Sequence, residues 1–169
     1  MPRVTCEMRA RVEMQGFVGL SDEAISDIVY WLRLAPFVCA AWTVVGLWQA
    51  SALVIWALAP FAALGAVLPR HPFDVLYMRV IRPWRGSAPI PEYGAPRRSA
   101  CVVATVWLTA TGACLAAGAV TAGRALGLVF VAIASVQVAT GFCIPSWVYG
   151  RVSGWRPTGV ALGERRPDL

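Results

Sequence analysis

Charge is missing from three long stretches of this 169-residue sequence. Residues 34–69, 99–123 and 125–150 contain no Asp, Glu, Lys or Arg. Charged residues make up 14% of the chain and hydrophobic residues 58%, whereas soluble domains have roughly 25% and 45–50%. The composition therefore excludes an ordinary soluble domain. A membrane-crossing helix needs about 20 apolar residues, so the first uncharged run can hold two short helices and each of the others one. The sequence therefore predicts an all-α membrane protein with four crossings.

The four crossings are expected as two helical hairpins. The predicted transmembrane helices span residues 28–48, 52–68, 100–120 and 126–145. Residues 49–51 suit the first turn, and Gly123 and Gly127 flank the second. Pro145 is expected to end the fourth helix.

The helices define a transmembrane domain over residues 21–150, with a polar segment before it (1–20) and a tail after it (151–169). The loop 69–99 joins the two hairpins. After Pro72 its apolar residues recur at helical spacing, which predicts an amphipathic helix lying on the membrane surface and ending at Pro83.

Lysine is absent, so all fifteen basic residues are arginine. Fourteen of them fall on the side that the termini and the central loop share, and Arg124 falls opposite. Since Arg-rich segments resist translocation, both termini are predicted to be cytoplasmic. Topology and anionic lipid account for the net charge of +6, and no recognition motif accompanies it, so we do not expect a nucleic-acid partner.

Histidine occurs once, at His71, which excludes a bis-histidine haem site or a histidine-rich metal site within one chain. Hydrogen bonding at a helix end is its expected role. The five cysteines are not spaced for zinc, and a cytoplasmic position for most of them disfavours disulfides. We predict no metal and no cofactor, although the bundle leaves room for a bound lipid or pigment.

Residues 4–15 alternate between apolar and polar side chains, which is typical of a β-strand. Such a strand would need a partner edge, and a helical or disordered tail is the alternative. The proline-rich stretch 86–96 is a second candidate contact. The predicted partner-binding residues are Val4, Met8, Val12, Pro89, Pro91 and Tyr93.

Aromatic residues and arginines near the predicted helix ends are expected to anchor the protein at the membrane interface. These are Tyr30, Trp31, Arg33, Phe73, Tyr77, Trp84, Trp147 and Tyr149. Within the fourth helix, Gln137 is expected to form an interhelical hydrogen bond.

Three motifs carry a family resemblance: HPFDVLY from His71, PEYGAPRRSAC from Pro91 and GFCIPSWVY from Gly141. With these motifs the chain resembles, over about residues 24–154, a bacterial integral-membrane family known as domain of unknown function 4395. The resemblance implies a four-helix fold in the bacterial inner (cytoplasmic) membrane and no established activity. It also implies a second cysteine three positions after Cys143, where this chain has Ser146. A two-cysteine redox motif is thus incomplete, which favours packing over reactivity for Cys143.

Two functions compete at this stage. The first is a non-enzymatic subunit that binds or stabilises a larger membrane complex, such as a respiratory or photosynthetic one. Its partners would be other membrane protein subunits and the lipid bilayer. The sequence is also compatible with a homo-oligomer. A lipid or small-molecule carrier ranks last, because no polar pathway crosses the helices.

The alternative is a thiol-dependent redox or sulfur-handling protein that uses Cys143 with Cys101. Topology places the two thiols at similar depth on neighbouring helices. Arg97, Arg98 and Arg151 are the candidate cations beside them. On the predicted layout, the C-terminal end of the fourth helix opposes a thiolate at Cys143.

Overall fold

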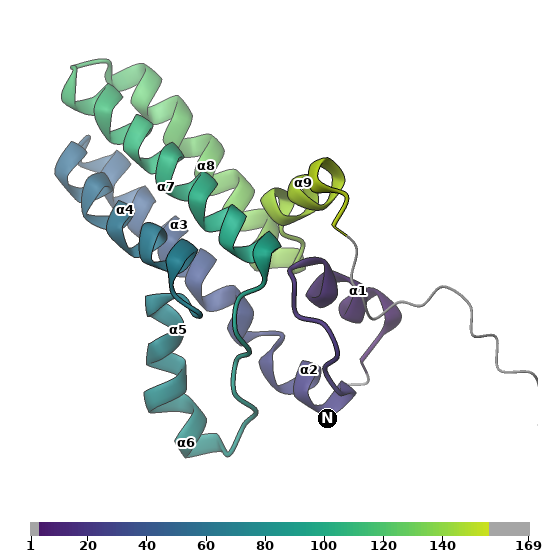
Figure 1. Ribbon diagram of the computed structural model, residues 1–169. Helices are drawn as coiled ribbons and strands as arrows, with labels where there is room; N and C mark the ends of the chain where they lie inside the picture. Colours follow the sequence, from purple (N-terminus) through teal and green to yellow (C-terminus); the bar gives the residue numbers. More distant parts are fainter. Residues whose placement is uncertain (1–3, 156–169) are drawn as a thin grey trace, which may run out of the picture.

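The computed structural model describes residues 4–155, and over this range all regular structure is helical (Figure 1). The end of the predicted C-terminal tail, 156–169, lies outside the described residues. The elements are α1 (Cys6–Met14), α2 (Asp22–Ile28), η1 (Trp31–Arg33), α3 (Leu34–Trp48), α4 (Ala52–Val67), α5 (Pro72–Leu76), η2 (Tyr77–Ile81, a π-helical turn), α6 (Arg82–Arg85), α7 (Ala95–Ala116), α8 (Val120–Thr140) and α9 (Ile144–Ser153).

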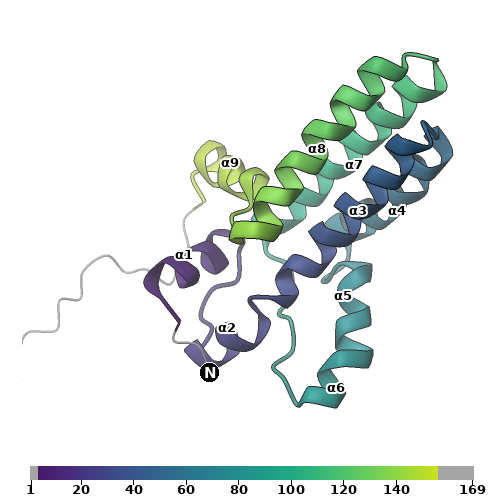
Figure 2. The ribbon, with the colours of Figure 1, turned by 180° about the vertical axis from the view of Figure 1, so that it is seen from behind.

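Four long helices, α3, α4, α7 and α8, lie side by side and form a bundle (Figures 1 and 2). Three segments of the described chain are long and apolar enough to cross a membrane: residues 31–48, α7 and α8. Helix α4 meets the same test only together with residues 72–84, across a bend of 81°. The structure thus has three candidate spans, or four if the bent pair is one.

The first turn of the bundle lies at the expected residues. Ser51 caps α4, since its hydroxyl accepts a hydrogen bond from the Val54 N–H at 3.4 Å. The second turn is not at Gly123 and Gly127, as expected, but at 117–119. Both glycines are buried inside α8.

Helix packing explains why those two glycines do not form a turn. A Cβ atom on Gly123 would lie 2.6 Å from Leu115 Cδ2, and one on Gly127 would lie 2.4 Å from Leu47 Cδ2. Their missing side chains therefore let α7 and α3 approach α8 closely.

Helix α8 ends at Thr140, five residues before the proline that was expected to end it. Gly141 follows with φ +74°, the left-handed conformation that glycine adopts readily and that terminates many helices. Pro145 instead lies in the first turn of α9, where a proline has no N–H to leave unpaired. This correction changes the electrostatics of Cys143.

The predicted N-terminal strand is wrong, because residues 6–14 form helix α1. The Thr5 hydroxyl caps it by accepting from the Met8 N–H at 3.2 Å. Ion pairs at i,i+4 spacing, Arg11 with Glu7 and Arg9 with Glu13, are available only to a helix. These local interactions override the alternating pattern.

A second core lies outside the long bundle and joins the N-terminal helices to the central loop. Its largest buried members include Phe17, Ile25, Ile28, Tyr77 and Ile90. The segment 86–94 returns across this core. Its backbone is fixed there because the carbonyl of Ile90 accepts from Arg70 Nε at 2.7 Å.

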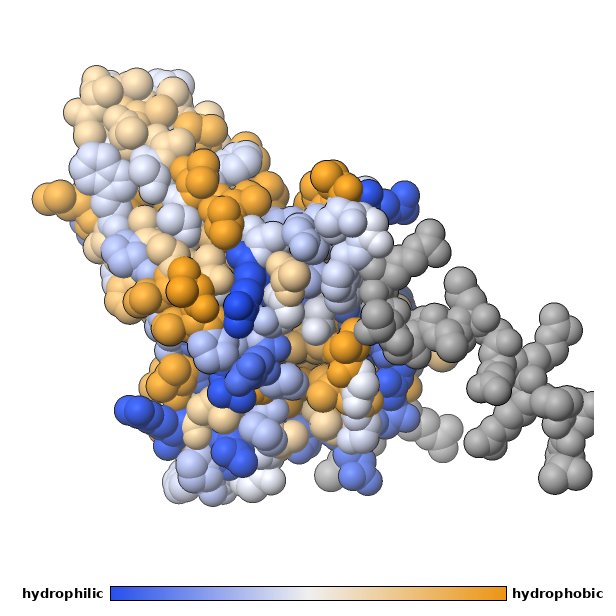
Figure 3. All heavy atoms as spheres, viewed as in Figure 1, coloured by the Kyte–Doolittle hydropathy of each residue, from blue (hydrophilic) through white to orange (hydrophobic). Residues whose placement is uncertain are grey.

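The segment after Pro72 is helical, as predicted, but the helix continues past Pro83 to Arg85. A π-helical turn, Tyr77–Ile81, precedes α6. Pro83 lies in the first turn of α6, where a backbone N–H would have no partner within the helix, so the proline removes no hydrogen bond. Figure 3 shows the most hydrophilic residues in the lower part of the view, interspersed with apolar ones, while apolar residues prevail over the long helices above.

Candidate thiol site

A cavity of about 90 Å³ lies among α3, α4, α7 and α8, at the end of the bundle where α9 begins. Most of its lining is apolar, and it includes Ala62, Phe130 and Ala134. Its polar and thiol-bearing lining residues include Cys39, Cys101, Cys143, His71, Arg97 and Gln137. The structure therefore brings the two cysteines of the sequence-based redox hypothesis to one cavity.

Cys143 is the N-cap residue of α9 and is 1% exposed. The sequence predicted that a helix C-terminus would oppose a thiolate here. That expectation is wrong, because α8 has already ended and the positive end of the α9 dipole faces Cys143.

Ser146 lies one turn into α9 and turns back towards Cys143. Its hydroxyl is 3.1 Å from Cys143 Sγ and 3.0 Å from the carbonyl oxygen of Pro96. A thiol at Cys143 can donate to this hydroxyl while the hydroxyl donates to Pro96, whereas a thiolate would accept from it. Ser146 thus contacts Cys143 directly from the first turn of α9.

Arg97 brings a positive charge to the cavity and is 4% exposed. Its Nη2 donates to the Leu32 carbonyl at 2.9 Å, its Nη1 donates to Gln15, and its guanidinium lies 5.2 Å from the centre of the Tyr93 ring. Among residues 4–155, no carboxylate lies within ion-pair distance of it. Asp74 lies further away, and the charge of Arg97 acts on it without a direct ion pair. Because burying a charge without a direct partner is costly, the site favours a nearby anion.

The two other candidate cations take different positions. Arg98 is half-buried at the start of α7, and Arg151 is exposed on α9, 5.1 Å from the centre of the Trp147 ring. Of the three arginines, Arg97 is the buried one that lines the cavity.

Gln15, at the end of α1, closes the site from the N-terminal side. Its amide oxygen accepts from Arg97 and, at 3.3 Å, from Gln137. Its amide nitrogen donates to the carbonyls of Arg11 at 3.1 Å and Gly141 at 2.9 Å. Gln137, expected to bond within the bundle, therefore has a partner in α1's C-cap.

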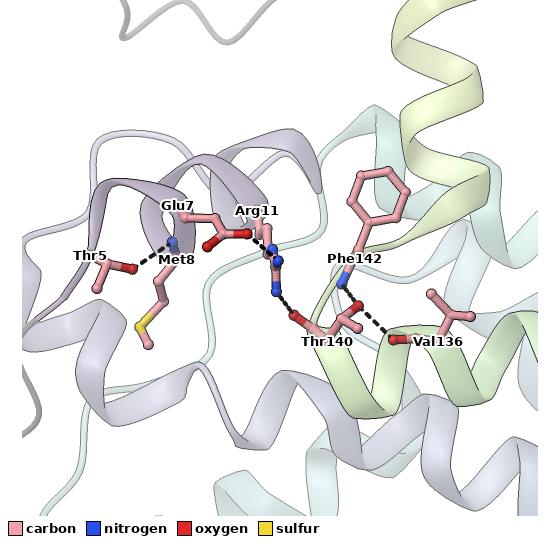
Figure 4. Close-up of polar contacts among 7 residues, drawn as sticks. All are labelled: Thr5, Glu7, Met8, Arg11, Val136, Thr140 and Phe142. Atoms are coloured by element: carbon pink, nitrogen blue, oxygen red, sulfur yellow. Dashed lines mark hydrogen bonds and ion pairs between the residues drawn. The ribbon is translucent and has the colours of Figure 1, made fainter.

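Arg11 makes a second connection between α1 and the end of α8 (Figure 4). Its guanidinium donates to the Thr140 carbonyl and pairs with Glu7 on its own helix. Arg33 donates to the carbonyls of Val138 and Ala139, both at 3.1 Å. Two arginines thus satisfy carbonyls at the negative end of α8, where cations are stabilising.

His71 is the N-cap of α5, and its Nδ1 accepts from the Phe73 N–H at 3.3 Å. Its ring and the thiol of Cys101 both lie against Gly65. A Cβ atom at Gly65 would be 2.4 Å from His71 Cδ2, 3.2 Å from its Nε2 and 3.0 Å from Cys101 Sγ. Burial lowers the pKa of His71 to about 4, and the charge of Arg97 adds to the shift, so the ring is neutral near pH 7.

Asp74 and Tyr93 form a buried pair beside the cavity. The Tyr93 hydroxyl donates to Asp74 Oδ2 at 2.5 Å, while Asp74 Oδ1 has no hydrogen-bond partner among the described residues. Burial raises the pKa of Asp74, although the Tyr93 hydrogen bond opposes the shift. Burial also raises the pKa of Tyr93 well above its usual value. Burial therefore disfavours the charged form of each group.

Most of the predicted partner-binding residues contact the rest of their own chain. Val12 and Tyr93 are buried in the second core, and Val4 and Met8 pack against it. The remaining two are a half-buried Pro91 and an exposed Pro89.

The predicted interfacial anchors divide into buried and exposed residues. Tyr77 is fully buried, donates its hydroxyl to the Ala88 carbonyl at 3.0 Å and contacts the Trp31 ring, which is tilted by 33° against it. It therefore belongs to the second core. Phe73 is half-buried and stacks on Phe61 at 5.2 Å between ring centres.

The remaining anchors lie nearer the surface. Trp84 is 94% exposed at the end of the central helix, and Tyr30 and Trp147 are also exposed. Tyr149 is half-buried on α9. Arg33 lies 5.6 Å from the centre of the Tyr30 ring, besides its contacts with α8.

Sequence reasoning missed Gln15 and Cys39 as residues of this site. Gln15 lies 82 residues from Arg97 and 122 from Gln137, and no motif marked it. Cys39 lies inside the first predicted transmembrane helix, where no motif marks it. Only its depth relative to the other thiols, which needs the bundle geometry, could have placed it at the cavity.

Over the described residues the fold is an all-helical bundle with three segments apolar enough to cross a membrane, or four if the bent pair is one span, and with thiols at one end. The chain belongs to the family described as domain of unknown function (DUF4395), whose model matches residues 29–153. No curated protein and no solved structure matches it. Helices α1 and α2 precede the matched range.

Proposed function

We propose that the protein is an integral membrane protein that carries out thiol–disulfide exchange, with Cys143 as the nucleophile and Cys101 as the resolving thiol. The observation that carries this proposal is the buried Arg97, which has no carboxylate partner among the described residues and lines one cavity with both cysteines. Cys143 is also the N-cap of α9, and the Ser146 hydroxyl lies 3.1 Å from its sulfur.

The exchange needs no further reagent. The Cys143 thiolate attacks one sulfur of a substrate disulfide, forms a mixed disulfide and releases the first substrate thiolate, which takes up a proton. Cys101 then loses its proton and attacks Cys143 Sγ, which forms the Cys101–Cys143 disulfide and releases the second substrate thiol. Two protein thiols are oxidised and one substrate disulfide is reduced.

The proposed setting is the bacterial inner membrane, crossed by α3, α4, α7 and α8 as two hairpins with both termini in the cytoplasm. The arginine distribution supports this orientation, as does the hydrophilic half in Figure 3. Residues 72–85 would then lie at the cytoplasmic surface, where the exposed Val80 and Trp84 suit the interface. Cys101 and Cys143 would meet substrates from that side.

The test measures disulfide exchange in the full chain, reconstituted in nanodiscs and equilibrated with glutathione redox buffers. Peptide mass spectrometry should find a Cys101–Cys143 disulfide, and Cys101→Ser should leave a mixed disulfide on Cys143. Arg97→Gln should slow alkylation of Cys143. Cys114→Ser is the control, because Cys114 lies on the same helix as Cys101 but outside the cavity lining. Alkylation of Cys143 no faster than that of Cys114, with no disulfide, would remove the proposal.

The accessory-subunit hypothesis stays a prediction. It relied on an N-terminal segment and a proline-rich loop that needed partners, and both pack within their own chain. Purification in mild detergent from native membranes separates the two functions: a stoichiometric companion protein would support a subunit, whereas a lone chain with an active dithiol would not.

A further inference from the structure

The cavity offers little to a water-soluble ligand. Its walls come from α3, α4, α7 and α8, and residues such as Pro36, Ala104 and Ile133 make most of them apolar. On the proposed topology these helices are the membrane spans. A molecule that reaches the thiols from the bilayer would therefore be lipophilic, since apolar walls recognise apolar ligands.

His71 gives this apolar cavity a directed hydrogen-bond donor. Because its Nδ1 accepts from the Phe73 N–H, the neutral ring carries its proton on Nε2. The ring lines the cavity, and Nε2 lies beside the same glycine as the Cys101 sulfur. A carbonyl oxygen placed there would accept from Nε2 while close to a thiol.

We propose that the cavity admits the carbonyl edge of a lipid-soluble quinone, which accepts the electrons of the Cys101–Cys143 dithiol. This inference rests on the proposed function. Two S–H bonds break and one S–S bond forms, and the two electrons and two protons pass to the quinone, which leaves as the quinol. Exchange in the reverse direction, with a substrate dithiol that is oxidised to a disulfide, returns the Cys101–Cys143 disulfide to thiols. His71 Nε2 donates to the quinone carbonyl and acts as a positioning residue.

The size of the cavity limits the contact to part of the headgroup. Its volume of about 90 Å³ is smaller than the roughly 150 Å³ of an engineered cavity that holds benzene. The carbonyl edge would enter, and the rest of the ring and its tail would lie outside the cavity. This placement brings the reacting carbonyl, rather than the tail, to the thiols.

The experiment uses the reduced full chain in nanodiscs with decylubiquinone as the probe. Quinol formation is followed by absorbance and the disulfide by peptide mass spectrometry. One quinol should form for each Cys101–Cys143 disulfide, and Cys143→Ser should abolish both. His71→Phe should raise the quinone concentration for half-maximal rate roughly tenfold, the effect of one lost hydrogen bond. The rate of exchange with oxidised glutathione is measured in the same variant, and a fall in the quinone rate relative to that rate marks a positioning role rather than a structural one.

His71→Asn serves as a second variant, because it retains an acceptor for the Phe73 N–H and should also weaken quinone use. If the disulfide forms with glutathione but no quinol appears, the quinone inference is overturned and the exchange function stands. If neither glutathione nor the quinone yields the Cys101–Cys143 disulfide, the exchange function and the quinone inference are both overturned. Quinone kinetics that are unchanged in both His71 variants would overturn the role given to His71.

Discussion

Replacing His71 with Asn should remove a loss of stability that the protein suffers in mild acid. In the folded chain, burial lowers the pKa of this histidine from 6.5 to about 4. Below pH 6.5 the unfolded chain therefore binds a proton that the folded chain does not. The stability due to neutral His71 is present above that pH and is lost as the pH falls towards 4.

The two pKa values set the size of the effect. Between pH 7 and pH 5 the folded state should lose about 2 kcal/mol relative to the unfolded state. For a chain of this size, that corresponds to a fall in Tm of about 4–8 °C. Asn can still accept the Phe73 N–H but does not titrate, so this part of the fall should be absent in His71→Asn.

Thermal unfolding in nanodiscs, followed by tryptophan fluorescence at both pH values, measures the difference. Comparing each variant with itself at two pH values cancels any change in baseline stability that the substitution causes. Cys114→Ser should behave as the wild type does. The reasoning would be refuted if His71→Asn lost as much Tm on acidification as the wild type, because the buried ring would then not be the group that resists protonation.

Three further predictions concern the packing around the site. Gly65→Ala should cost about 1–3 kcal/mol, because the new Cβ would lie 2.4 Å from His71 Cδ2; a Tm equal to that of the wild type would contradict this. Arg11→Gln should loosen α1 from the Thr140 carbonyl and speed proteolysis before residue 16, while Glu7→Gln should have a smaller effect. Asp74→Asn should raise Tm more at pH 7 than at pH 4. Burial raises the pKa of the Asp74 carboxyl, so the folded protein loses stability as the pH rises and the unfolded chain ionises first. An equal gain in Tm at both pH values would exclude buried ionisation as the cause.

The long helices could be predicted from the sequence because uncharged runs of the required length have few other solutions. The ends of these helices could not be predicted, because a glycine can either end a helix or let a neighbouring helix pack closely, and composition does not distinguish the two. Gly141 ends α8 through a positive φ, whereas Gly123 and Gly127 lie inside the helix and admit leucines. Choosing between these uses requires the neighbouring helix. For the same reason, the dipole that acts on Cys143 was assigned with the wrong sign.

The N-terminal segment shows the other limit of sequence reasoning. Its alternating pattern suggested a strand for an external partner, yet its apolar side chains meet a core that is built largely from residues 17–34 and 77–93. Interactions over such separations leave no local signal. The pattern was therefore assigned to an absent partner when the partner was the rest of the chain.

Gln15 makes this segment part of the site as well as part of the fold. It joins Arg97 on α7 to Gln137 on α8, and it lies before residue 29, where the family match begins. If Arg97 provides the charge for Cys143, then the position of that charge depends on α1 being docked. Loosening α1 through Arg11→Gln should consequently slow alkylation of Cys143, although Arg11 does not line the thiol cavity. Proteolysis that speeds up without any change in Cys143 labelling would show that the N-terminal helix covers the site without controlling it.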